Sequence, residues 1–120
     1  MYESPAYQER RRNPRANSAM PVQYRGMRQG GDATIGAIAR DISNGGIRLV
    51  VNEFLSIFTR LVVEISIPST PKPVRAISKV VWIRKRPYGE QYEVGMQFVD
   101  MTEEDKRNIF QFVERLIPKQ

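Results

Sequence analysis

The sequence predicts an all-β fold with one helix: a six-stranded antiparallel β-barrel and a C-terminal helix packed on it. Three observations lead to this prediction. Apolar residues alternate with polar ones at a period of two in several short segments, as in half-buried strands. Clusters rich in Gly and Pro separate these segments, as the turns of a small barrel require. Only the last segment changes to the period of a helix.

The alternating pattern begins at Met20, and glycine-marked or proline-marked turns interrupt it. An irregular apolar stretch after Val51 is expected to cap one end of the core. The six expected strands are residues 20–24, 34–42, 47–51, 61–67, 74–86 and 92–99. The short connections between them favour antiparallel neighbours.

The strand at residues 74–86 carries the sole tryptophan, Trp82. Apolar residues occupy both faces toward its end, which predicts a central strand covered on two sides. A lone tryptophan in such a strand is more often a core residue. The alternative is that its indole stacks on a base near a binding face.

The final segment is a helix with clear end signals. Thr102 is a good N-cap, and Asp105 follows three residues later in the capping-box position. The first turn is acidic, which the helix dipole favours, and Pro118 ends the helix. One stripe is apolar, and it consists of Ile109, Phe112, Val113, Leu116 and Ile117. We expect this stripe to plug an open end of the barrel.

The composition excludes several classes of chemistry. The chain has 120 residues, enough for one core, and it has no Cys and no His. The usual nucleophile and base pairs cannot be built without them, so we expect neither an enzyme nor a metal or cofactor site. No apolar run is long enough to span a membrane, and the N-terminus lacks the core of a signal peptide. We therefore expect a cytoplasmic protein.

Positive charge is concentrated in the first quarter of the chain. The net charge is +6, and residues 1–30 hold six arginines against two glutamates, with no lysine. Arginine pairs bidentately with phosphate or with the O6 and N7 edge of guanine, and it stacks on ring faces. Such a segment suits an anionic guanine ligand. The alternative is a solvated basic tail without a fixed partner.

The expected domain organisation is simple. Residues 1–9 hold few large aliphatic side chains and are predicted to be disordered. Residues 10–117 form one domain that includes an arginine-rich arm at 10–15, and residues 118–120 are a tail. In the arm, Pro14 disfavours a helix, so Arg11 and Arg15 belong to a loop or an extended segment.

The stretch from Arg40 to Val51 predicts a hairpin. Asp41 and Ser43 leave one face of an extended strand, which places a carboxylate and a hydroxyl at the rim. Asn44, Gly45 and Gly46 accept positive φ and therefore a tight reversal. The pattern D-x-S-x-x-G also has a simpler interpretation, a turn stabilised by local hydrogen bonds to Asx and Ser side chains.

The two patterns together, R-x-x-x-R followed about 25 residues later by D-x-S-x-x-G, closely resemble the PilZ domain. The resemblance covers roughly residues 9–116 and includes the closing strand VGMQF at 94–98. One departure is the segment 53–60, which lacks the Pro and Gly often found before the next strand. The matching positions are Arg11, Arg15, Asp41, Ser43 and Gly46.

The resemblance implies a bacterial second-messenger receptor that binds cyclic di-GMP. Arg11 and Arg15 would contact phosphates or guanine edges and stack on a base. Asp41 would accept hydrogen bonds from N1 and N2 of a guanine, and Ser43 would bond to a base or a phosphate. Gly46 would let the ligand approach the backbone. The secondary candidates are Arg10, Arg12, Asn44, Gly45 and Trp82.

The arm is expected to be mobile when empty because its arginines repel one another. Ligand would then order it against the barrel and change the surface that a downstream protein contacts. We expect a monomer or weak homodimer without specific nucleic-acid binding. Two alternatives stay open: a PilZ-like adaptor that works through protein contacts without nucleotide, and a basic β-barrel that binds single-stranded nucleic acid.

Overall fold

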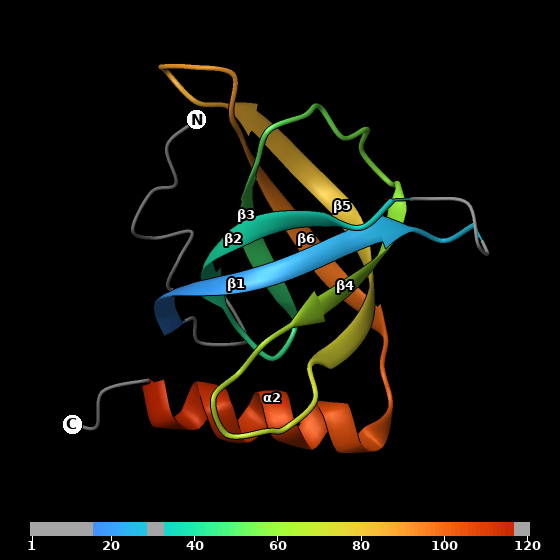
Figure 1. Ribbon diagram of the computed structural model, residues 1–120, viewed down its shortest axis with the longest axis vertical. Helices are drawn as coiled ribbons and strands as arrows, with labels where there is room; N and C mark the ends of the chain where they lie inside the picture. The colour runs from blue at the N-terminus through green and yellow to red at the C-terminus, as the bar shows by residue number, and fades with distance from the viewer. Residues whose placement is uncertain (1–15, 29–32, 117–120) are drawn as a thin grey trace.

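The structure is a computed structural model that describes residues 16–28 and 33–116. Its strands form a closed antiparallel barrel in the order β1-β2-β3-β6-β5-β4, and the helix α2 lies across one end (Figure 1). The elements are β1 Ala16–Gly26, β2 Ile35–Ile42, β3 Gly46–Val51, β4 Arg60–Ile65, β5 Val74–Lys85, β6 Tyr92–Asp100 and α2 Glu103–Leu116. The predicted fold, a six-stranded antiparallel barrel with a C-terminal helix, is confirmed.

The first strand closes the barrel because it pairs with both β2 and β4. It begins at Ala16 and not at Met20 as predicted. The additional residues are small or polar and carry no alternating pattern, so the sequence did not mark them as a strand. They extend β1 until Ala16 pairs with Ile42 and Asn17 with Asp41, across a bulge between Asn17 and Met20.

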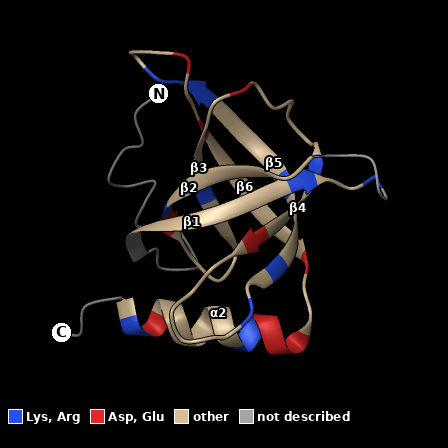
Figure 2. Ribbon diagram, viewed as in Figure 1, with Lys and Arg blue, Asp and Glu red and all other residues tan. Residues whose placement is uncertain are grey.

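The helix closes the lower end of the barrel, as predicted. Thr102 Oγ1 accepts a hydrogen bond from the Asp105 N–H at 3.1 Å, which confirms the N-cap. The Asp105 carboxylate does not complete a capping box with Thr102; it accepts the backbone N–H of Arg75 at 3.3 Å. This contact joins the acidic first turn of α2 (Figure 2) to the start of β5.

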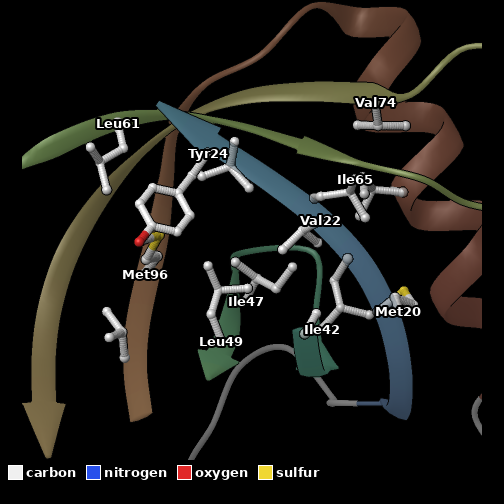
Figure 3. Close-up of a cluster of buried hydrophobic side chains, with 14 of the residues drawn as sticks. Met20, Val22, Tyr24, Ile42, Ile47, Leu49, Leu61, Ile65, Val74 and Met96 are labelled. Carbon is white, nitrogen blue, oxygen red and sulfur yellow. The ribbon is translucent and has the colours of Figure 1, made fainter. Parts of the chain in front are cut away.

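The core lies inside the barrel and extends onto the helix. Inward side chains of all six described strands meet at its centre (Figure 3), including Val22, Leu49 and Met96. Three residues of the predicted helical stripe, Ile109, Phe112 and Val113, are buried against it. Leu116 is partly buried, and Ile117 lies outside the described residues.

The expectation that β5 is covered on both faces is wrong. From Val74 to Val80 its fully buried residues are separated by exposed or half-buried ones, and Val81 is 38% exposed. A closed barrel of this size has only one interior, so its other face meets solvent unless another element covers it. Within the described residues, no helix is both long and apolar enough to cross a membrane.

Candidate functional site

A row of four residues crosses the outer face of the barrel from the β2–β3 hairpin to β5. Asp41 pairs with Arg48, Arg48 with Gly95, and Gly95 with Trp82. On each strand, one neighbour of the row residue is buried in the core or packed against it, and these neighbours are Ile42, Ile47, Val94 and Ile83. The row itself therefore faces outward. We call these four residues the outer row. They bring a carboxylate of the predicted motif and the sole tryptophan to one face.

Asp41 lies at the hairpin end of the outer row and is only 6% exposed. Its Oδ2 accepts a hydrogen bond from Arg48 Nε at 2.8 Å. Burial alone would lower the pKa of Arg48, but its hydrogen bond to Asp41 and the charges of Asp41 and Glu93 raise that pKa above its ordinary value. Arg48 is therefore a permanent cation that orients the Asp41 carboxylate.

Ser43 is buried in the turn, and its hydrogen bonds are local. The Gly45 N–H donates to Ser43 Oγ at 3.2 Å, and the Ser43 N–H donates to the Gly46 carbonyl at 2.9 Å. These contacts match the simpler interpretation of the pattern, a turn held by its own serine. The loop is also tied to β6, because the Phe98 N–H donates to the Gly45 carbonyl at 2.9 Å.

The expectation that residues of this turn have positive φ is wrong. Among the described residues, positive φ occurs only at Phe58 and Gly89, and not at Asn44, Gly45 or Gly46. The reversal uses a longer loop than a two-residue turn, so it does not require left-handed backbone. Asn44 is exposed at its tip.

Gly46 is required for another reason, its contact with β6. A Cβ at this position would lie 2.2 Å from the Met96 carbonyl oxygen, well inside contact distance. The obstacle is backbone, so it cannot move aside as a side chain could. Gly46 therefore fixes how closely β3 approaches β6.

Trp82 lies on the outer face and is not a core residue. It is partly buried, and its indole covers Gly95, where a Cβ would lie 2.1 Å from Trp82 Nε1. The guanidinium carbon of Arg84 lies 5.9 Å from the centroid of the indole. The absence of a side chain at Gly95 thus creates a flat aromatic surface beside Arg48.

Sequence reasoning missed three charged residues that contact this site: Arg48, Glu93 and Arg84. Glu93 Oε1 accepts hydrogen bonds from Arg48 Nη1 at 3.3 Å and from Arg84 Nη2 at 2.5 Å. The period-two pattern puts Arg48 and Glu93 on the polar face of their strands. It puts Arg84 on the same face as the buried Val80, because the register shift between Val80 and Trp82 is not visible in the sequence. It does not show that the three strands are neighbours, so the pairing was not readable from the sequence.

The predicted arginines of the arm, Arg10, Arg11, Arg12 and Arg15, lie outside the described residues. The described chain begins immediately after Arg15, with Ala16. Because Ala16 pairs with Ile42, the chain enters the barrel beside Asp41.

A family model described as the PilZ domain matches residues 9–115. The chain belongs to this family, as the two sequence motifs predicted. No curated protein sequence matches the chain.

The solved structures that share the fold include the following three. The Bacillus subtilis inhibitor of motility, MotI/DgrA, is 22% identical in sequence and superimposes with a TM-score of 0.72. The match covers 88% of this chain and 50% of the MotI/DgrA chain. The PilZ domain with c-di-GMP of YcgR from Escherichia coli is 16% identical, with a TM-score of 0.68. That match covers 89% of this chain and 91% of the YcgR domain. MrkH in the K. pneumonia MrkH–c-di-GMP complex is 22% identical, with a TM-score of 0.70. Here the match covers 89% of this chain and 51% of the MrkH chain. The chain spans about half the length of MotI/DgrA and of MrkH.

Proposed function

We propose that the chain is a receptor for cyclic di-GMP and that the ligand binds on the outer face beside the β2–β3 hairpin. The observation that carries this proposal is the outer row, in which only Arg48 separates the Asp41 carboxylate from the indole of Trp82 over Gly95. Membership of the PilZ family supports the proposal. So do the structures of YcgR and MrkH, which have the same fold and contain c-di-GMP.

The chemistry of the row suits a guanine base. The Asp41 carboxylate accepts hydrogen bonds from the N1 and N2 groups of guanine, which adenine does not present. Trp82 and the Arg84 guanidinium over its ring offer flat surfaces on which a base stacks, and a base on an aromatic ring is worth roughly 1–3 kcal/mol. Arg48 adds a cation that attracts the ligand phosphates.

Arg11 and Arg15 complete the site in this proposal. They precede Ala16, whose pairing with Ile42 brings the chain to the hairpin. From there their guanidinium groups bind the phosphates or the guanine edges, with Arg10 and Arg12 adding positive charge. Ser43, Asn44, Gly45 and Gly46 act by shaping the hairpin that presents Asp41.

The response to ligand is a change of surface without catalysis. Binding orders the arginine-rich arm against the barrel, and a downstream protein recognises the ordered surface. The proposed receptor is an adaptor in bacterial second-messenger signalling that acts in the cytoplasm.

Isothermal titration calorimetry with cyclic di-GMP tests the proposal. We expect wild-type protein to bind with a stoichiometry of one or two ligands per chain, and we expect Arg11→Ala and Asp41→Ala each to weaken binding at least tenfold. Cyclic di-AMP should bind far more weakly than cyclic di-GMP, because Asp41 selects for guanine. No heat of binding and no rise in melting temperature with wild-type protein at saturating cyclic di-GMP would overturn the proposal.

Two controls make the result specific. Arg107→Ala removes an arginine from the exposed surface of α2, and Asp100→Ala removes a carboxylate from the exposed end of β6. Both should leave the affinity for cyclic di-GMP unchanged. A single-stranded homopolymer that binds more tightly than cyclic di-GMP, with a steep salt dependence, would identify a nucleic-acid-binding barrel instead.

A further inference from the structure

A chain of four charged residues runs across the outer face from the hairpin to Trp82. Asp41 Oδ2 accepts from Arg48 Nε at 2.8 Å, Arg48 Nη1 donates to Glu93 Oε1 at 3.3 Å, and Arg84 Nη2 donates to the same Glu93 oxygen at 2.5 Å. Arg84 also lies over the Trp82 ring. We call Asp41, Arg48, Glu93 and Arg84 the ionic chain. It connects the carboxylate of the motif with the aromatic ring.

The ionic chain crosses four adjacent strands. Asp41 pairs with Arg48 across β2 and β3, and Glu93 pairs with Arg84 across β6 and β5. Within the ionic chain, the contact between Arg48 and Glu93 is the one that joins β3 to β6. The Glu93 side chain is 16% exposed, against 30% for Arg48 and 38% for Arg84. The central carboxylate is thus the most enclosed of the three.

Glu93 holds two arginines that would otherwise repel each other. Burial alone would raise its pKa, but its hydrogen bond to Arg84 and the charges of Arg84, Arg48 and Arg86 keep that pKa below its ordinary value. Glu93 is therefore ionised at neutral pH. If Glu93 lost its negative charge, Arg48 and Arg84 would repel each other across one surface. Each arginine side chain would then be free to turn into solvent.

We propose that Glu93 is a positioning residue for the nucleotide site. It keeps Arg48 against Asp41 and Arg84 over Trp82, so that the hydrogen-bonding carboxylate and the flat surface made by the Arg84 guanidinium and the indole are presented together. This inference rests on the proposed function, and it assigns a role to a residue outside both sequence motifs. Preorganisation of this kind reduces the entropy that is lost when a ligand binds.

The test uses Glu93→Gln, which keeps the shape of the side chain and removes its charge. We expect its affinity for cyclic di-GMP in calorimetry to fall about tenfold. Because Trp82 is the sole tryptophan, its fluorescence emission reports this ring alone, and the emission should shift in Glu93→Gln even without ligand. Glu90→Gln, in the exposed turn before β6, is the matched control and should change neither quantity.

A second variant, Arg84→Gln, tests the ionic chain from the end that lies beside Trp82. Its result does not depend on whether the Glu93→Gln protein folds. Arg84→Gln should also shift the Trp82 emission and weaken binding. The double variant, Arg84→Gln with Glu93→Gln, should lose no more affinity for cyclic di-GMP than the single variant with the larger loss, because both substitutions act through the same contact. Additive losses would overturn the inference. So would wild-type affinity and unchanged emission in Glu93→Gln.

The two proposals fail in different ways. Absence of cyclic di-GMP binding by wild-type protein would overturn the proposed function before any variant is needed. Binding by wild type that falls with Asp41→Ala, but not with Glu93→Gln or Arg84→Gln, would leave the receptor function in place and overturn only the role of Glu93.

Discussion

The β2–β3 hairpin and the Trp82 surface each contain a glycine in a crowded position, but the two glycines face different obstacles. The Cβ that Gly46 lacks would meet the backbone carbonyl of Met96, whereas the Cβ that Gly95 lacks would meet the indole of Trp82. Backbone in a closed barrel cannot shift without disturbing its hydrogen bonds, whereas a partly exposed ring can rotate away. The hairpin is therefore a rigid part of the site, and the aromatic surface is an adjustable one.

The largest expected effect is on the rigid side. Gly46→Ala forces a Cβ to within 2.2 Å of Met96 O, so we expect a loss of about 3 kcal/mol in the free energy of unfolding. The melting temperature should fall by roughly 10 °C. Thermal denaturation followed by circular dichroism measures it. Gly36→Ala is the control, because no atom lies within 4 Å of the Cβ position there. Equal melting temperatures for both variants would refute the rigid contact.

Gly95→Ala tests the adjustable side. The added methyl group takes the place of the indole, and we expect Trp82 to swing into solvent at a cost of only about 1 kcal/mol in stability. The emission of this sole tryptophan should move to longer wavelength, and the affinity for cyclic di-GMP should fall. An emission spectrum identical to that of wild type would show that the ring does not lie over Gly95.

Acid should weaken the outer face through Glu93. The pKa of Glu93 is lowered in the folded protein, so its contribution to stability is present above the unfolded pKa, about 4.3. That contribution disappears as the pH falls through the lower pKa of the folded state. Urea unfolding at a series of pH values should show a shallower acid loss for Glu93→Gln than for wild type or Glu90→Gln. Identical slopes for all three proteins would contradict the expectation.

The smallest effect is expected inside the barrel, on the strand that carries Trp82 on its outer face. Ser78 is fully buried, and its hydroxyl has no hydrogen-bond partner among the described residues. Ser78→Ala removes a buried polar group without leaving an empty space larger than one oxygen atom. We expect a gain of up to about 1 kcal/mol, measured by urea unfolding, with unchanged ligand affinity. A loss of stability would indicate that the hydroxyl is hydrogen-bonded.

Much of the fold was predictable because its signals are local. Alternation along Val22, Tyr24 and their neighbours indicates a half-buried strand wherever that strand pairs, and Thr102 caps the helix through its own hydrogen bond. The start of β1 was missed because Ala16 and Asn17 carry no alternation and form a strand only through their partners on β2.

The candidate site was predictable in its motif but not in its surroundings. Asp41 was named from the sequence, and its place at the rim of a hairpin follows from local pattern. Trp82 was expected more often in the core, and Arg48, Glu93 and Arg84 were not named at all. Their contacts depend on β3 lying beside β6 and β6 beside β5, with Arg48 and Glu93 separated by 45 positions.

The sequence by itself determined the barrel class, the capped helix and the family, because period, end signals and motif spacing are properties of short segments. The tertiary structure decided which face Trp82 occupies, why position 46 must be glycine, and which arginine holds Asp41. These are properties of strand order and register, and they arise only when the barrel closes and brings residues from distant strands into contact.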